Sequence, residues 1–345
     1  MEKRPVLGIT MGDPAGVGPE IIIKALTRAE LSRFCRPVIF GDPSILERAR
    51  RVAGSRLPIR CIRSLAQADF SGDALQLMEL SRLDPAAITP GRPNEACGKA
   101  MARYIVEAVR RTLDGALDGL VTCPINKVLL QRAGYLFQGH TQMIAHLTGT
   151  LHPVMMLAGK RLKVSLVTIH CPLRDVPHQL SIEKILKVIT TTGRCLVSDF
   201  GVHEPKIGVA GLNPHAGEQG LFGDEELTMV APAVREASKR GWKVEGPFPG
   251  DTLFWRASQG EFDAVVAMYH DQGLAPFKLL HFADGVNVTL GLPIVRTSVD
   301  HGTAYEVAGK GMADPGSLIS AIELAATMVR NRREGLSRQG TPNQK

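Results

Sequence analysis

The sequence predicts an α/β fold with a largely parallel sheet. Short runs rich in β-branched residues are each followed by a turn containing Gly, Pro or Asn and then by a segment with helical periodicity. Strands that alternate with helices are typical of α/β proteins, because a helix is the usual connection between parallel strands. With 345 residues, the chain is long enough for a large core and for two domains.

The expected elements follow one another from the N-terminus with no internal repeat and no long linker. The predicted strands are Val6–Thr10, Val38–Phe40, Gly119–Thr122, Val154–Leu157, Lys163–Ile169, Lys206–Gly211, Ala264–Met268 and Val286–Thr289. The predicted helices are Pro19–Leu31, Cys97–Thr112, Ile182–Ser198, Glu225–Arg240 and Pro315–Arg333. Residues 334–345 are polar and contain Gly and Pro, which predicts a flexible tail.

Composition argues against several classes of protein. The net charge is +7, but the basic residues are scattered and form no stripe with aromatic residues, so we expect no nucleic-acid partner. No leader segment and no long apolar run is evident, which predicts a cytoplasmic protein without a membrane partner. The six cysteines form no CxxC pair, which favours reduced cytosolic thiols over a zinc knuckle.

A glycine-rich loop, Met11–Glu20, follows the first predicted strand and opens a helix at Pro19. Such a loop can present backbone N–H groups to an anion, or it can simply form a tight turn that needs glycine dihedrals. It matches neither the GxGxxG dinucleotide pattern nor a P-loop, since it has no lysine of that type. Both interpretations stay open from the sequence.

Three histidines share one placement: His170, His215 and His270 each lie just past the end of a buried-looking strand. In α/β sheets ligands gather at the carboxyl ends of strands, and three imidazoles there suit Zn²⁺ or another divalent ion. Structural, hydrogen-bonded histidines are an equally open interpretation. Asp251 and Asp271 could add ligands or support them, and either could equally be a turn or capping residue.

Other polar residues indicate an anionic ligand. His140 and Thr141 place an imidazole and a hydroxyl in one turn. Lys278, Asn287 and Arg296 offer the donors that a phosphate monoester and a carboxylate require, although the two cations could also be solvated surface charges. Arg296 follows the apolar run LGLPIV, which predicts a position at a strand end.

The last distinctive segment is a glycine-punctuated loop before a helix. It could cradle a ligand or simply turn the chain. Its residues are Asp300, His301, Gly302, Thr303 and Ala304.

With these motifs laid out, the chain resembles the 4-hydroxythreonine-4-phosphate dehydrogenase family of vitamin B6 biosynthesis, from Gly12 to about residue 330. The resemblance rests on GDPAGVGPE, TCPINK, GHT, TIHCPLRD, GLNPHAGEQGLFGDEE, GPFPGDTLF, AMYHDQGLAPFK, GVNVTLGLPIVRTSVDHGTA and GKGMADPGS. The DHGTA loop and the segment after it also resemble the adenosine-binding loop of isocitrate and isopropylmalate dehydrogenases.

This resemblance implies their two-domain α/β fold, with a cleft between the domains and a nicotinamide cofactor held without a GxGxxG motif. We expect residues 1–130 and 280–333 to form the cofactor-side domain. Residues 131–279 would form the domain for metal and substrate binding and for dimerisation.

The resemblance also implies roles for individual residues. His170, His215 and His270 would bind one divalent metal (zinc, magnesium or cobalt), with ligands from both subunits of a homodimer. The substrate would contact His140, Thr141, Lys278, Asn287 and Arg296. The cofactor would contact Asp300, His301, Gly302, Thr303 and Ala304. No residue is assigned as the general base.

The implied reaction is oxidation of 4-phosphohydroxy-L-threonine with NAD or NADP, followed by decarboxylation to 3-amino-2-oxopropyl phosphate in pyridoxal phosphate biosynthesis. Gln142 departs from the Glu that is common in the family, so a substrate ammonium could be less well matched. The first alternative is therefore a dehydrogenase of 4-phospho-D-threonate or 4-phospho-D-erythronate in sugar-acid catabolism.

Two alternatives belong to other classes: a metal-dependent phosphohydrolase and a non-catalytic binding protein. The cofactor-like loop argues against a hydrolase, as does the lack of a carboxylate cluster for a second metal. A protein that only binds a ligand would have little reason to retain three strand-end histidines.

Overall fold

The computed structural model describes residues 4–28 and 30–339. The chain divides into two compact units, unit 1 with Met1–Pro153 and Leu292–Arg330, and unit 2 with Val154–Gly291 and Asn331–Lys345. The boundaries between the units in this part of the chain therefore fall after Pro153 and Gly291. The sequence analysis had placed them after residues 130 and 279. The chain leaves unit 1 after Pro153, returns to it at Leu292 and leaves it again after Arg330, which agrees with a sequence that has no long linker.

Unit 1 is built on a parallel sheet in the order β3-β4-β2-β1-β5-β12. The central strands β1, β2 and β5 are buried over most of their length, which explains why they are largely apolar runs in the sequence. The strands are β1 (Val6–Thr10), β2 (Arg36–Gly41), β3 (Ile59–Ile62), β4 (Leu75–Glu79), β5 (Gly119–Thr122) and β12 (Val295–Val299).

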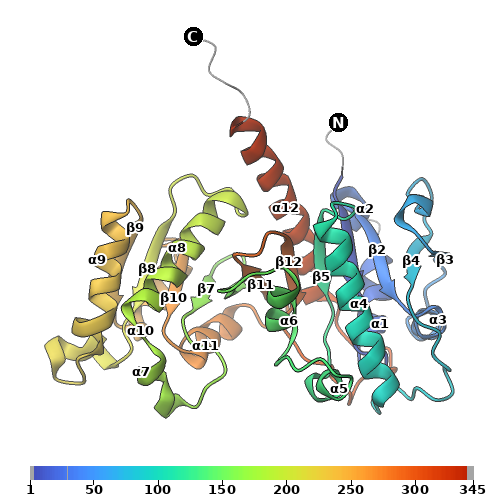
Figure 1. The fold of residues 1–345 in the computed structure, drawn as a ribbon, viewed down its shortest axis with the longest axis horizontal. Helices are drawn as coiled ribbons and strands as arrows, with labels where there is room; N and C mark the ends of the chain where they lie inside the picture. Colours follow the sequence, from blue (N-terminus) through green and yellow to red (C-terminus); the bar gives the residue numbers. More distant parts are fainter. Residues whose placement is uncertain (1–3, 29, 340–345) are drawn as a thin grey trace, which may run out of the picture. The chain divides into compact units, whose positions relative to one another are not determined.

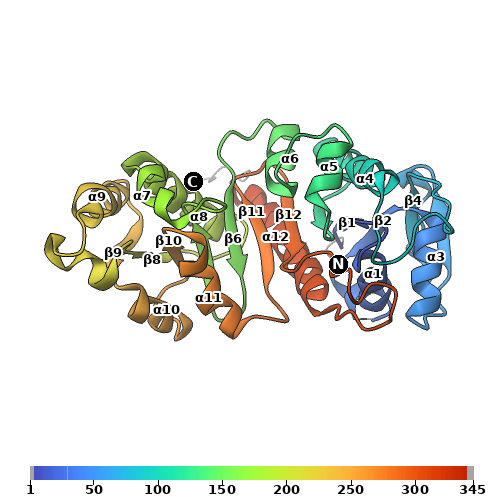
Figure 2. The same ribbon diagram turned by 90° about the horizontal axis from the view of Figure 1, so that it is seen from below.

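Helices flank this sheet on both faces: α4 lies on one face and α1 on the other (Figure 2). The helices are α1 (Gly18–Leu26), α2 (Leu31–Phe34), α3 (Pro43–Val52), the 3₁₀ turn η1 (Leu65–Gln67), α4 (Glu95–Leu113), α5 (Lys127–Arg132), α6 (His140–Leu147) and α12 (Gly316–Gln339). The last of these continues beyond Arg330 into residues assigned to unit 2.

Unit 2 has the strand order β11-β6-β7-β10-β8-β9. Strands β7, β10, β8 and β9 are parallel, and β6 runs antiparallel between β11 and β7. The strands are β6 (Val154–Ala158), β7 (Lys163–Leu166), β8 (Lys206–Ala210), β9 (Lys243–Phe248), β10 (Ala264–Ala267) and β11 (Val286–Leu290).

Figure 2 shows α8 and α9 on one face of this sheet and α10 and α11 on the other. The helical segments are η2 (Leu173–Asp175), α7 (Val176–Gln179), α8 (Ile182–Ser198), η3 (Pro214–Gly220), the π-helix η4 (Glu226–Val230), α9 (Ala231–Lys239), α10 (Gly250–Ser258) and α11 (His270–Leu280). One buried cluster joins the sheet to α10 and α11, and includes Leu157, Val164, Leu166, Leu253, Phe254, Phe262, Val265 and Phe277.

The predicted α/β class, with mostly parallel sheets and flanking helices (Figure 1), is confirmed. The expected helix over Pro19–Leu31 ends at Leu26, and a second short helix begins only at Leu31. Helix α12 runs to Gln339, so residues 334–339 of the expected tail are helical. Residues 340–345 lie outside the described part of the chain.

Among residues 4–28 and 30–339, no helix has both the length and the apolar character needed to cross a bilayer.

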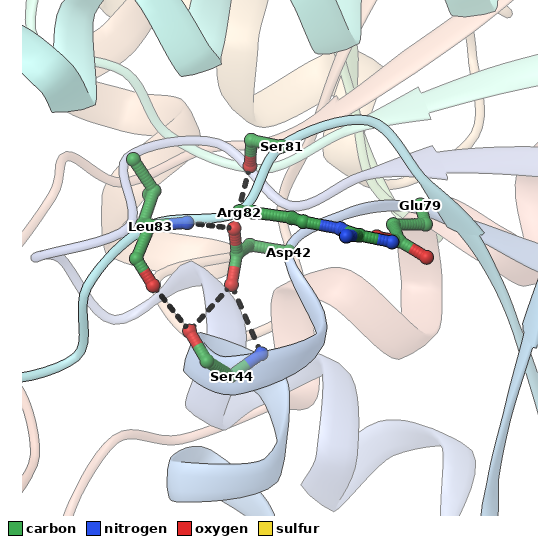
Figure 3. A network of polar contacts seen from close by, with 6 residues as sticks. All are labelled: Asp42, Ser44, Glu79, Ser81, Arg82 and Leu83. Carbon is green, nitrogen blue, oxygen red and sulfur yellow. Dashed lines mark hydrogen bonds and ion pairs between the residues drawn. The ribbon is translucent and has the colours of Figure 1, made fainter.

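A buried carboxylate, Asp42, connects the end of β2 to the next helix and to the segment after β4 (Figure 3). One oxygen accepts hydrogen bonds from the Ser44 and Ile45 amides at the start of α3 and from the Ser44 hydroxyl. The other oxygen accepts from the Ser81 hydroxyl and the Leu83 amide, each at 2.7 Å. A carboxylate suits this position because every surrounding group is a donor.

Replacing Asp42 with Asn should lower the free energy of unfolding by about 2–3 kcal/mol, because one amide N–H₂ would face the donors that the carboxylate now accepts. Urea denaturation measures this change. The matched control is Asp69→Asn, since the Asp69 side chain is 48% exposed. Equal losses at the two positions would contradict the role given to Asp42.

Candidate active site

Three neighbouring strands of unit 2 carry the predicted metal ligands at one edge. Strand β10 pairs in parallel with β7 on one side and with β8 on the other. His170 follows β7, His270 follows β10 as the first residue of α11, and His215 follows β8. The predicted placement at strand carboxyl ends is confirmed, whereas the metal role stays a prediction.

His170 and His270 line the same pocket, together with Cys171, Tyr269 and Asp271 among others. The pocket volume is about 470 Å³, and the two imidazole centroids are 5.8 Å apart. An ion bound ~2.1 Å from one nitrogen of each ring would place the centroids roughly 5–6 Å apart. The pair therefore fits two ligands of one metal ion.

Carboxylates orient two of the three imidazoles. Asp271 Oδ1 lies 2.7 Å from His270 Nδ1, and Glu218 Oε2 lies 2.9 Å from His215 Nδ1. Each contact leaves Nε2 for a ligand, which is the arrangement usual for metal-binding histidines. Asp271 thus contacts a predicted ligand, whereas Asp251 is exposed in the first turn of α10.

The third histidine is not part of this pair. Within residues 4–28 and 30–339 of one chain, no three His, Cys, Asp or Glu side chains come together as a metal site. The structure therefore brings His170 and His270 together and leaves His215 outside their group.

His215 lies in a strained turn. Five consecutive residues, His215–Gln219, have left-handed backbone angles, with φ between 43° and 82°, and only Gly217 among them is a glycine. Each non-glycine residue in this conformation costs roughly 1–2 kcal/mol. Such a turn persists only where the surrounding contacts enforce it.

The buried carboxylate of Glu226 supplies contacts at the entry to this turn. It accepts hydrogen bonds from the Leu212 and Asn213 amides, both at 2.7 Å, and from Asn213 Nδ2 at 3.0 Å. A Cβ atom at Gly217 would lie 2.6 Å from Glu226 Oε2, so only glycine fits there. The carboxylate therefore determines the path of the turn that presents His215.

Gln272 connects the strand ends that precede His215 and His270. Its Nε2 donates to the Gly211 carbonyl at 2.6 Å, and its Oε1 accepts from the Met268 amide at 2.7 Å. One side chain of α11 therefore sets the spacing between the ends of β8 and β10.

In unit 1, Arg296 is the second residue of β12 and is buried, so the prediction of a strand end was wrong. The sequence of β12, VRTSV, lacks the apolar run that marks the other central strands, and the LGLPIV run lies mostly before it. Arg296 Nη2 donates to Thr122 Oγ1 at 2.7 Å. Burial lowers the pKa of this guanidinium. A cation held away from water attracts an anion more strongly than an exposed one does.

His140 and Thr141 form the first turn of α6, after Gly139. The Nε2 atom of His140 is buried and has no hydrogen-bond partner among the described residues. Burial and the positive charges of Arg296 and Lys127 lower the pKa of His140 well below its ordinary value. The imidazole is therefore neutral at physiological pH and available to hydrogen-bond an uncharged or anionic group.

Gln142 is exposed, and its side chain supports the start of α6. Its Oε1 accepts from the Gln138 amide at 2.8 Å, and its Nε2 donates to Gln138 Oε1 at 3.1 Å.

The remaining predicted substrate residues belong to unit 2. Lys278 is on α11, with Nζ 5.5 Å from the centroid of the Phe282 ring. Asn287 is in β11, opposite Leu157 of β6.

The predicted cofactor loop follows β12. The Asp300 amide is bonded to Ser317 Oγ at 3.0 Å, and the Thr303 carbonyl accepts from the Val17 amide at 3.0 Å. His301 is exposed, and no atom lies within 4 Å of a Cβ position built on Gly302, so a ligand has room to approach. A carboxylate for ribose hydroxyls and an exposed imidazole are groups that fit an adenosine.

The glycine-rich loop Met11–Glu20 supports this segment and is itself buried throughout. A Cβ atom on Gly18 would lie 2.1 Å from the Met11 carbonyl oxygen, and one on Gly12 would lie 2.3 Å from the Pro124 carbonyl oxygen. These close backbone approaches favour the tight-turn interpretation over an open anion site.

Comparison with known proteins agrees with this arrangement. A family model described as pyridoxal phosphate biosynthetic protein PdxA matches residues 33–325. The chain belongs to the PdxA family. This confirms the resemblance found in the sequence, and the matched PdxA relatives are dehydrogenases.

A PdxA relative from Desulforapulum autotrophicum, named 4-hydroxythreonine-4-phosphate dehydrogenase, is 51% identical over 94% of this chain and 96% of its own length. A D-threonate 4-phosphate dehydrogenase from Cupriavidus necator is 45% identical over 95% of this chain and 99% of its own. A crystal structure of the Klebsiella pneumoniae 4-hydroxythreonine-4-phosphate dehydrogenase is 43% identical, with a TM-score of 0.86, over 94% of this chain and 98% of that one.

The sequence analysis missed residues that support the candidate site, namely Glu226, Gln272, and the pair Asp13 and Tyr305, whose side chains are hydrogen-bonded to each other. Glu226 and Gln272 bind loops through backbone groups, and no pattern of residue types marks such contacts. Tyr305 offers one signal, because it directly follows the Asp300–Ala304 loop.

Replacing Glu226 with Gln should lower the affinity of the protein for Zn²⁺ or Co²⁺ about tenfold, because the turn that presents His215 loses its enforcing carboxylate. Calorimetric titration of the metal-free protein measures this affinity. The neighbouring control is Glu225→Gln, since Glu225 accepts only from Asn213 Nδ2 among these groups. Equal affinities in the two variants would exclude the proposed role of Glu226.

Proposed function

We propose that this PdxA family member oxidises the secondary hydroxyl of 4-phosphohydroxy-L-threonine with NAD, and that decarboxylation then gives 3-amino-2-oxopropyl phosphate for pyridoxal phosphate biosynthesis. The main support is that relatives named 4-hydroxythreonine-4-phosphate dehydrogenase reach 51% identity over 94% of the chain. We further propose that the enzyme acts in the cytoplasm as a homodimer with a site shared between subunits. The phosphohydrolase hypothesis loses its support, because these relatives are dehydrogenases.

His170 and His270 would hold a divalent metal, with His215 as a third ligand. A zinc, magnesium or cobalt ion there would supply Lewis acidity that lowers the pKa of the substrate hydroxyl. Asp271 and Glu218 would keep the Nε2 atoms of His270 and His215 directed at it. Since the described residues of one chain group only two of the histidines, ligands from two subunits fit this donor set.

Arg296, Lys278 and Asn287 would bind the phosphate and carboxylate of the substrate. Their groups are donors, which match anionic oxygens. Thr141 and the neutral imidazole of His140 would hydrogen-bond the polar groups between those anions without adding charge.

The loop Asp300–Ala304 would bind the adenosine half of the cofactor. The Asp300 carboxylate supports NAD over NADP, because a carboxylate accepts from a ribose hydroxyl and repels a 2′-phosphate. His301 and Gly302 leave room for the adenosine, as their exposure indicates.

A second candidate is oxidation of D-threonate 4-phosphate, in which a hydroxyl replaces the substrate amino group. The observation in its favour is Gln142, a neutral side chain that is bonded to Gln138 where the family commonly has a carboxylate. Relatives from Cupriavidus necator and Oceanobacillus iheyensis carry D-threonate 4-phosphate dehydrogenase names.

Turnover with the two substrates separates these candidates. With NAD and a divalent metal, NADH should form with 4-phosphohydroxy-L-threonine at a kcat/KM at least about tenfold above that with 4-phospho-D-threonate or 4-phospho-D-erythronate. Turnover of the aldonates alone would replace the main proposal with the second candidate. If no NADH forms with any of the three substrates, both candidate functions are contradicted.

Replacing Arg296 with Ala should raise KM for the phosphorylated substrate by about 100-fold, because a buried charge-assisted contact is lost. The change in kcat should be much smaller, since Arg296 is proposed to bind and not to react. Arg296→Lys, which keeps the charge without the planar fork, should give an intermediate KM. An unchanged KM in the Ala variant would show that Arg296 does not bind the substrate.

A further inference from the structure

The hydroxyl of Tyr305 lies between two polar side chains of unit 1. It donates to Asp13 Oδ2 at 2.5 Å and accepts from Asn126 Nδ2 at 2.9 Å. Asp13 is fully buried, and its other oxygen accepts from the Ala15 amide at 2.9 Å. Burial raises the pKa of both Asp13 and Tyr305. Through these contacts Tyr305, which directly follows the Asp300–Ala304 loop, is bound to the loop after β1.

The residue before Tyr305 is strained. Ala304 has a φ of 42°, a left-handed conformation that costs a non-glycine residue roughly 1–2 kcal/mol. The chain is fixed on both sides of it, because the Thr303 carbonyl accepts from the Val17 amide and the Tyr305 side chain binds Asp13. Strain of this kind needs such flanking contacts in order to persist.

The backbone on either side of Ala304 also packs closely against glycines. A Cβ atom on Gly91 would lie 2.7 Å from the Tyr305 carbonyl oxygen, and one on Gly16 would lie 3.1 Å from the Thr303 carbonyl oxygen. The Gly91 amide in turn donates to the Ala15 carbonyl at 2.8 Å. The loop is therefore held against a surface that the tight glycine turn has shaped, and a change in the angles of Ala304 would move it away.

We propose that Tyr305 and Asp13 are positioning residues for the cofactor. Through their hydrogen bond they hold Ala304 in its left-handed conformation and so fix the loop Asp300–Thr303 in the shape that binds the adenosine. This inference rests on the proposed function of that loop. Neither side chain need touch the cofactor, since both act through the backbone of residues 303–305.

The test uses Tyr305→Phe, which removes the hydroxyl and keeps the ring. NADH affinity, followed by fluorescence titration, should fall about tenfold, as expected for the loss of a hydrogen bond to a carboxylate. Zn²⁺ affinity should stay unchanged. Tyr135→Phe makes the same chemical change elsewhere in unit 1 and should leave NADH affinity unchanged.

A second substitution separates positioning from general stability. Ala304→Gly in the Tyr305→Phe background should recover about threefold of the lost affinity, because glycine adopts the left-handed conformation without a steric cost. No recovery, with faster hydrogen exchange throughout unit 1, would overturn the proposal in favour of a structural role. Asp13→Asn weakens the same contact from the other side and should lower NADH affinity as well, so the test stands even if one variant folds poorly.

Hydrogen exchange at the Val17 amide reports the contact without any cofactor. It should be faster in Tyr305→Phe and slower again in the double variant. Unchanged exchange would overturn the positioning role itself. Faster exchange with unchanged NADH affinity would show that the contact fixes the loop but that the loop does not bind the cofactor, which would overturn the proposed function of the loop.

Discussion

Buried carboxylates that accept hydrogen bonds from backbone amides stabilise the loops at the carboxyl ends of the strands. Asp42 after β2, Asp13 after β1 and Glu226 beside the loop after β8 all do this. Loops that enter the protein interior carry N–H groups that must find acceptors, because an unpaired buried amide is costly. A carboxylate offers up to four acceptor positions at one point, so a single side chain can fix a whole turn.

The candidate site depends on two of these carboxylates. Glu226 enforces the left-handed turn of His215, and Asp13 binds the tyrosine that follows the predicted cofactor loop. Strain at His215–Gln219 and at Ala304 lies where the polar residues with proposed roles are presented. A parallel sheet brings strand ends to one edge, and the carboxylates then determine which way each loop turns there. Catalytic side chains must be placed accurately, and this placement depends on both the sheet and the carboxylates.

The sequence predicted what depends on local patterns. Strands β1 and β5 and helix α8 have the expected bounds, because the two buried strands are short apolar runs and the apolar residues of α8 repeat with the helical period. Strand β12 was missed because its sequence, VRTSV, contains a buried arginine, and helix α6 because its polar first turn hides the pattern. His170, His215 and His270 could be identified from the sequence because each lies just past the end of a strand-like apolar run. The roles of Glu226 and Asp13 depend on contacts between distant loops, which no spacing in one sequence reveals.

The central claim is that the loops after β7, β10 and β8 bring histidines to one metal ion. A crystal structure of the protein grown with Zn²⁺, with anomalous diffraction recorded at the zinc absorption edge, tests it most directly. The account predicts one strong peak per active site, ~2.1 Å from Nε2 of His270 and from a ring nitrogen of His170, with His215 completing the ligands. A zinc peak elsewhere, with the imidazole centroids of His170 and His270 still 5.8 Å apart and neither ring bound to metal, would contradict the claim.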